Sequence, residues 1–232
     1  MNIHLLRNGC FTIAKNFLVY GKYRTEIYKA ALKPMLVMTR KEKILVDTGI
    51  GELPPHYGKR HQLERSEDQT MQAQLSGFGL KPEDITIVIN THLHFDHCGR
   101  NRLFRKARFY VQADELRYAY RPDRFQKAAY LRDFFDVDVD YESVRGRYRI
   151  TDDVTILPTP GHSIGHQSVI VKKDAGNLVY CGDAAPLREN LAKRNIPGVL
   201  YRADEALQSI DRLRTISNAS YIFSHDNEQR SL

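Results

Sequence analysis

Short apolar segments separated by turn residues recur along the whole chain. In the first half, four of these segments are rich in β-branched and aromatic residues, which favour strands over helices. The predicted strands cover residues 11–20, 34–38, 43–49 and 81–90. The pattern changes twice between them. The glycine- and proline-rich stretch 49–62 predicts a loop, and residues 66–79 predict a helix. Ser66 is the expected N-cap of that helix, and Gly77 or Gly79 is expected to end it.

The second half of the chain alternates strands and helices in the same way. A strand is predicted at 107–112, a helix begins at 113, and a second helix at 202–216 places apolar residues at helical intervals. Two strand pairs are expected, 154–159 with 167–173 and 177–182 with 221–225. We find no repeat and no linker in the sequence. The alternation therefore predicts an α/β fold in a single domain, residues 1–232.

One apolar segment ends in a dense group of side chains that bind metals. The run "ITIVINTHLHFDHCGRN" places His92, His94, Asp96 and His97 directly after a predicted strand. His92 and His94 share one face of an extended strand, whereas Asp96 and His97 require a turn immediately after it. Imidazole and carboxylate groups are preferred ligands of zinc and similar divalent cations. We therefore interpret the group as a metal site.

Three more potential ligands follow predicted strands elsewhere in the chain. His162 follows a strand and a Pro-Gly turn, Asp183 follows the strand in "NLVYCGD", and His225 follows "YIFS". Strand ends at one edge of a sheet converge in α/β folds. Seven ligands are too many for one tetrahedral zinc, and they suit two metal ions that share a bridging carboxylate.

The remaining histidines and the cysteine beside the motif are given structural interpretations. His4, His56 and His61 stand in polar surroundings without a pattern and are predicted to be surface residues. His166 is either a support for a metal ligand or part of a local hydrogen bond, and we favour the latter. Cys98 is predicted to pack in the core.

Composition limits the classes of protein that remain. The chain has 232 residues, of which 42% are hydrophobic and 27% charged, as in an ordinary folded protein. No apolar stretch approaches the roughly 20 residues that a bilayer requires, and no signal peptide is evident, so a cytoplasmic protein without membrane contact is expected. The net charge of +7 admits nucleic acid as a partner. Basic and acidic residues are interleaved, however, which makes a nucleic-acid surface unlikely.

Four motifs occur in an order that resembles the metallo-β-lactamase superfamily. These are "THLHFDH", "PGH", "GDAA" and "SHD", within a match that extends from "ILVDTG" to "SHDNEQ". The resemblance implies a four-layer αββα sandwich. It implies that His92, His94 and His162 bind one metal ion, that Asp96, His97 and His225 bind the other, and that Asp183 bridges the two. Asp47 is implied to support the site from beneath.

Within the superfamily, the motif strings are most similar to those of the N-acyl homoserine lactonases. "THLHFDHCGR", "TPGHSIGHQS" and "SHDNEQ" carry this similarity, which implies that Phe95 lines the pocket for the acyl chain or lactone. These lactonases commonly have a tyrosine three residues after the bridging aspartate, and this chain has Pro186 there. Tyr118 and Tyr130 are candidates to supply the missing hydroxyl group.

The resulting hypothesis is a dinuclear metal-dependent hydrolase. Two divalent ions, zinc or alternatively manganese, iron or cobalt, would generate a bridging hydroxide that opens a lactone or similar small ester, with Asp96 as proton shuttle. Two alternatives are a thiolester hydrolase of the glyoxalase II type and, less favoured, a zinc-dependent nuclease. The sequence leaves the oligomeric state open, including a homodimer.

Overall fold

The computed structural model describes residues 1–229, and its strands form three sheets. The first sheet has the order β1 (Asn2–Leu5), β4 (Met35–Met38), β5 (Lys43–Val46), β7 (Ile87–Ile89), β8 (Arg108–Gln112) and β9 (Asp140–Val144). The second has the order β10 (Tyr148–Arg149), β11 (Val154–Pro158), β12 (Gln167–Lys173), β13 (Gly176–Tyr180) and β14 (Ala219–Ile222). A small third sheet joins β3 (Ile27–Ala31), β2 (Cys10–Ala14) and β6 (Leu63–Glu64).

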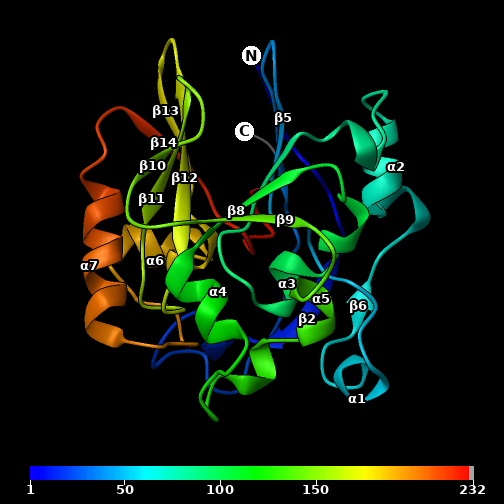
Figure 1. Ribbon diagram of the computed structural model, residues 1–232. Coiled ribbons are helices and arrows are strands. Elements are labelled where there is room, and N and C mark those ends of the chain that lie inside the picture. Colours follow the sequence, from blue (N-terminus) through cyan, green and yellow to red (C-terminus); the bar gives the residue numbers. More distant parts are fainter. Residues whose placement is uncertain (230–232) are drawn as a thin grey trace.

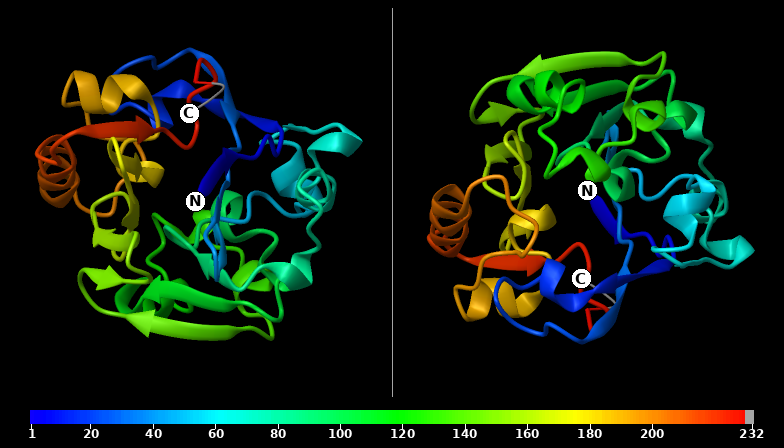
Figure 2. Two further views of the ribbon diagram at one scale, coloured as in Figure 1. Left: turned by 90° about the horizontal axis from the view of Figure 1, so that it is seen from above. Right: turned by 90° about the horizontal axis from the view of Figure 1, so that it is seen from below.

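Short helices and 3-10 turns connect these strands. The helices are α1 (Pro55–Gly58), α2 (Met71–Ser76), α3 (Phe95–Cys98), α4 (Ala113–Ala119), α5 (Arg132–Phe135), α6 (Arg188–Ala192) and α7 (Ala203–Arg214). The 3-10 turns are Lys15–Phe17, Glu67–Gln69, Pro82–Asp84, Asn101–Leu103, Lys127–Ala129 and Gly182–Ala184. Helices α7 and α2 lie on opposite sides of the molecule, with the two large sheets between them (Figures 1 and 2).

The two large sheets pack face to face. Successive residues of their central strands point to opposite faces of the sheet, and both faces of these strands are apolar. In β5, Ile44 and Val46 enter the core between the sheets, whereas Leu45 faces outward to the layer that contains α2. In β13, Leu178 and Tyr180 enter the same central core, and the intervening residue packs toward α7. The order is therefore helix, sheet, sheet, helix, which confirms the predicted four-layer αββα sandwich.

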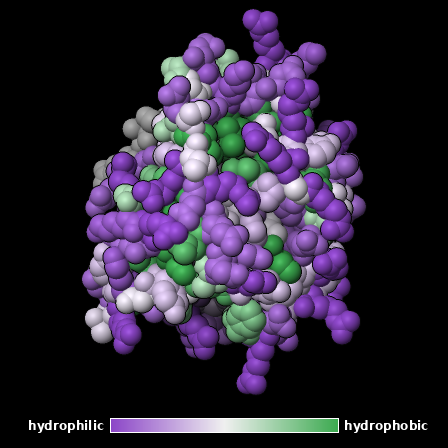
Figure 3. All heavy atoms as spheres, turned by 90° about the vertical axis from the view of Figure 1, so that its left-hand side faces the viewer, coloured by the Kyte–Doolittle hydropathy of each residue, from purple (hydrophilic) through white to green (hydrophobic). Residues whose placement is uncertain are grey.

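The amphipathic helix α7 closes one side of the sandwich. Its residues Ala206, Ile210 and Leu213 are buried, and the last two pack against the outer face of the second sheet. The face of the molecule on that side is covered mostly by hydrophilic side chains, with apolar side chains visible only in places between them (Figure 3). Among the described residues, none of the helices has the length and apolar character needed to cross a bilayer.

Most of the predicted elements are present, and the main errors concern their bounds. The predicted strand pairs form β11 with β12 and β13 with β14, the latter parallel. The predicted strand 11–20 is only half correct, because β2 ends at Ala14 and a 3-10 turn follows. The predicted loop 49–62 contains the one-turn helix α1. The predicted helix 66–79 begins only at Met71, because Thr70 is extended and its hydroxyl accepts a hydrogen bond from Ala73 N at 3.3 Å.

Candidate metal centre

The seven predicted ligands lie together where four strands end. His92 and His94 lie in the loop after β7. His94 has an extended backbone and is the N-cap of helix α3, which carries Asp96 and His97. The others follow β11, β13 and β14. Donor atoms within 4.8 Å of one another form the groups His92–His94–His162, His92–His97–Asp183 and Asp96–His97–His225. We call the first group the three-histidine triad and the last the acidic triad.

Asp183 lies between the two triads. Its Oδ2 is 3.4 Å from His162 Nε2, on the side of the three-histidine triad. Its Oδ1 is 3.3 Å from His97 Nε2 and 3.2 Å from His225 Nε2, both in the acidic triad. One carboxylate thus turns one oxygen to each triad, which is the arrangement required of a bridging ligand.

The ring nitrogens that face away from the centre are held by hydrogen bonds. His162 Nδ1 donates to Val199 O at 2.9 Å, and His225 Nδ1 donates to Ala31 O at 2.8 Å. His97 Nδ1 is 2.8 Å from Asp47 Oδ2. Such contacts fix the ring orientation of metal-binding histidines and leave the other nitrogen free for the ion.

Asp47 supports the site from the end of the neighbouring strand β5. Its carboxylate accepts hydrogen bonds from Thr91 N at 2.7 Å and from Thr91 Oγ1 at 2.8 Å, and it is 2% exposed. Its backbone adopts φ of 59°, an uncommon conformation that asparagine and aspartate tolerate best. The carboxylate therefore joins the start of the ligand loop to His97, which agrees with the supporting role implied by the resemblance.

The electrostatics differ between the two triads. Burial, reinforced by the neighbouring imidazoles, holds the pKa of His92 and of His94 well below the usual value. Burial opposes the charge of His97 too, but Asp183, Asp96 and Asp47 outweigh it and raise its pKa well above the usual value. Burial thus favours neutral imidazoles in the three-histidine triad, whereas the carboxylates around His97 favour its charged form, with which a cation would compete.

The donor set fits a pair of divalent cations. The Nε2 atoms of His92, His94 and His97 are buried and make no hydrogen bond within residues 1–229. A buried polar nitrogen without a partner costs free energy. His94 faces the centre with Nδ1, 3.0 Å from His162 Nε2, so the unpartnered Nε2 atoms of His92 and His97 are the ones that call for a shared ligand there. The chemistry of this cluster is thus that of a divalent-metal site.

His166 combines the two roles that the sequence left open. Its ring is completely buried, and Nδ1 contacts Thr159 Oγ1 at 2.9 Å and Thr159 O at 3.1 Å. Its Nε2 accepts a hydrogen bond from Asp183 N at 2.9 Å. Burial, with the nearby His162, lowers the pKa of His166 to about 3. The local hydrogen bond that we favoured is present, and the neutral ring also orients the backbone of the bridging aspartate.

A cavity of about 380 Å³ opens beside the ligands. Apolar side chains form much of its wall, among them Phe11, Ile13 and Phe95, and Asp96 and Asp183 face it from the metal centre. His61, predicted to be a surface residue and not a ligand, is half-buried, belongs to none of the ligand groups and also lines this cavity. The loop after α1 folds back until the His61 ring lies 5.2 Å from the Phe95 ring, a contact that local sequence does not reveal. His4 is half-buried against Phe78, and His56 is exposed.

Neither proposed substitute for the missing tyrosine has a free hydroxyl group. Tyr130 OH donates to Glu115 Oε1 at 3.0 Å, and Tyr118 OH donates to Asp123 Oδ2 at 3.2 Å. Pro186 offers only its backbone carbonyl, which accepts from His225 N at 3.1 Å. Cys98 is buried in the apolar cluster that includes Phe95, which confirms its packing role.

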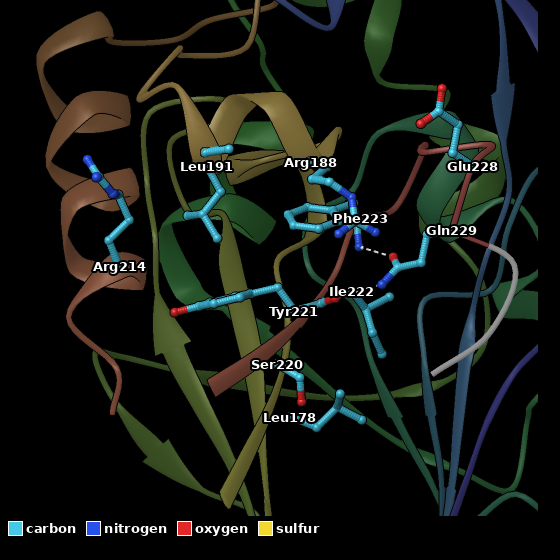
Figure 4. Close-up of a pocket in the computed structure, with 11 residues that line it drawn as sticks. Leu178, Arg188, Leu191, Arg214, Ser220, Tyr221, Ile222, Phe223, Glu228 and Gln229 are labelled. Atoms are coloured by element: carbon cyan, nitrogen blue, oxygen red, sulfur yellow. Dashed lines mark hydrogen bonds between the residues drawn. The ribbon is translucent and has the colours of Figure 1, made fainter. Parts of the chain in front are cut away.

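A larger cavity of about 750 Å³ lies beside β14, α6 and α7 (Figure 4). Arg188, Arg214 and Phe223 are among its lining residues, and none of the seven predicted ligands is. The chemistry of the lining residues, and not the volume, therefore identifies the smaller cavity as the candidate active site.

Comparisons with known proteins agree with this geometry. The model of the metallo-beta-lactamase superfamily matches residues 35–225. An N-acyl homoserine lactonase of Bacillus cereus is 32% identical over 208 residues, which cover 84% of this chain and 80% of that protein. An N-acyl homoserine lactonase of Azorhizobium caulinodans is 33% identical over 175 residues, which cover 69% of this chain and 65% of that protein.

Solved structures show the same likeness. An N-acyl homoserine lactone hydrolase with the product N-hexanoyl-L-homoserine at its catalytic metal centre superimposes with a TM-score of 0.87 at 25% identity. The alignment covers 98% of this chain and 94% of that one.

Proposed function

The chain belongs to the metallo-β-lactamase superfamily, and from this premise we propose that it is a dinuclear metal-dependent hydrolase of N-acyl homoserine lactones or similar lactones. The observation that carries the proposal is the cluster of seven ligands around Asp183, whose two oxygens face the two triads. The N-acyl homoserine lactonases among its relatives, and the product-bound structure described above, supply the substrate class.

We propose that the three-histidine triad holds one cation, that the acidic triad holds the other, and that Asp183 holds both. When bound, the cations act as Lewis acids that lower the pKa of water and draw electron density from a carbonyl oxygen. Imidazole nitrogens and carboxylates in small groups favour zinc, while manganese, iron and cobalt accept the same ligands.

Asp96 has the position needed to move a proton. Its side chain is 10% exposed, it lines the cavity, and its Oδ2 lies 3.4 Å from His225 Nε2. In the proposed reaction, its carboxylate takes the proton that the attacking water loses and gives it to the alkoxide oxygen that leaves when the ring opens. The apolar wall that includes Phe95 excludes water and binds the acyl chain.

The hydrolysis of lactones tests this function directly. Ring opening releases acid, so purified protein loaded with zinc is mixed with N-acyl homoserine lactones of several chain lengths in weak buffer with a pH dye. We expect acid release that depends on the metal and is stronger for chains that fill the apolar cavity. Hydrolysis of glutathione thiolesters or of structured RNA, without lactone opening, would contradict the proposal and favour one of the alternatives.

A further inference from the structure

A buried carboxylate on α4 joins the loops that carry the three-histidine triad. Glu115 is completely buried, although it belongs neither to the motifs nor to the ligand set. Its Oε1 accepts from Leu93 N at 3.0 Å and from Tyr130 OH at 3.0 Å. Its Oε2 accepts from Ser163 Oγ at 2.8 Å and from Gly165 N at 2.9 Å.

Each of these four donors stands next to the triad. Leu93 lies between His92 and His94, and Ser163 directly follows His162. The Tyr130 ring packs edge-on against the His94 ring, with 4.7 Å between the ring centroids. Glu115 therefore connects the ligand loop after β7, the ligand loop after β11 and the aromatic ring beside His94.

The loop after β11 approaches α4 too closely for any side chain at residue 165. A Cβ atom on Gly165 would lie 2.5 Å from Glu115 N and 2.6 Å from Glu115 Cβ. The glycine thus brings Gly165 N within reach of the carboxylate. A carboxylate offers about four acceptor positions, and the four donors occupy all of them.

We propose that Glu115 is a positioning residue that fixes the spacing of His92, His94 and His162 and thereby sets the affinity of this triad for its cation. The inference rests on the metal centre of the proposed function. Glu115 touches neither cation nor substrate, and it acts by holding two backbone loops at a fixed separation. Within the described residues Glu115 makes no hydrogen bond to the acidic triad, whose His97 is held by Asp47.

The variant Glu115→Gln is expected to break the connection at one point. Glutamine has one acceptor oxygen and one amide NH2 group. The NH2 group can face Tyr130 OH or Ser163 Oγ, because these hydroxyl groups can rotate and accept a hydrogen bond. It cannot replace an acceptor for a backbone N–H, which only donates. In either orientation of the amide, Leu93 N or Gly165 N loses its acceptor. Outer contacts of this kind change metal affinity by roughly 10–100-fold.

The test is a zinc titration of metal-free protein in competition with a chromophoric chelator. For Glu115→Gln we expect one of the two binding constants to fall roughly 10–100-fold and the other to stay within about twofold. The same fall is expected in the background His225→Ala, which keeps the three-histidine triad intact. Gly165→Ala, which displaces the loop and leaves Glu115 unchanged, should give the same selective loss. Asp114→Asn is the matched control, because Asp114 is a neighbouring carboxylate whose partners, Arg117 and Arg145, are exposed.

A second measurement separates positioning from a general role in folding. Lactonase activity of Glu115→Gln should be low at limiting zinc and should recover when zinc is raised. Unchanged zinc binding, or equal weakening of both sites, would overturn the inference whether or not the protein opens lactones. Selective loss of one site in a protein that opens no lactone would support the role of Glu115 and overturn the proposed function instead.

Discussion

The two triads of the metal centre are held by different kinds of support. The acidic triad is supported by Asp47, which follows β5, the parallel neighbour of the strand that precedes the ligand loop. The three-histidine triad combines loops from both large sheets, and Glu115 of α4 joins them. Both triads take ligands from both large sheets, because His225 follows β14 and His162 follows β11. The difference lies in the supports: His97 is held from an adjacent strand end of its own sheet, whereas Glu115 connects loops of both sheets.

The largest expected effect tests His97, one of the two residues that belong to two of the ligand groups. His97 belongs to the acidic triad and also groups with His92 and Asp183. For His97→Ala we expect loss of one of two zinc ions and a fall in kcat/KM of about 100-fold or more, since a metal ion contributes several kcal/mol of transition-state stabilisation. Elemental analysis and lactone kinetics measure both. Two zinc ions per chain in this variant would contradict the assignment of His97.

A smaller effect is expected when the support of the acidic triad is changed. In Asp47→Asn, the asparagine tolerates the φ of 59° at this position. If its side-chain oxygen still accepts from Thr91 N, however, its amide NH2 group faces His97 in place of the carboxylate oxygen. We expect the affinity of the acidic triad to fall roughly 10–100-fold. The three-histidine triad should be weakened less, because Asp47 reaches His92 only through Thr91, whose Oγ1 is 3.0 Å from His92 Nδ1. The zinc titration that tests Glu115 also measures this. If Asp47→Asn and Glu115→Gln both weakened the same site most strongly, the comparison between the triads would be wrong.

The smallest effect on activity at saturating zinc is expected for a substitution of Gly161, in the loop after β11, where this loop contacts α7. Gly161 has φ of 126°, and a Cβ atom there would lie 2.1 Å from Ala206 N. Strain and overpacking together should lower the free energy of unfolding by about 3 kcal/mol or more in Gly161→Ala. Urea unfolding of the metal-free protein measures this, and activity at saturating zinc should fall by less than about tenfold.

Gly146→Ala is the matched control for this last variant. Gly146 also has a positive φ, 74°, but a Cβ atom there would meet nothing within 4 Å. It should therefore cost only the backbone strain, about 1–2 kcal/mol. Equal destabilisation by the two variants would mean that contact with α7 contributes nothing to the position of the loop.

The candidate ligands could be identified from the sequence because they occur in short motifs directly after apolar strands. His92, His94, Asp96 and His97 lie within six residues of chain, and His162, Asp183 and His225 each follow a segment with a clear strand pattern. The apolar segments that form β5 and β13 likewise predicted strands, and the structure shows that they are buried on both faces. The α/β fold could be predicted for the same reason, because hydrophobic periodicity is a local property.

Contacts between segments that are distant in the sequence were decided by the tertiary structure and not by local patterns. His61 resembles a surface histidine in sequence, yet a folded-back loop brings it to the cavity wall beside Phe95. Glu115 resembles an ordinary helical carboxylate, yet four donors from three distant segments surround it. The sequence by itself determined which side chains form the candidate metal centre. Only the tertiary packing decided that groups such as Glu115 and the Ala31 carbonyl support them, because these hydrogen bonds join segments up to 194 residues apart at distances that no local pattern encodes.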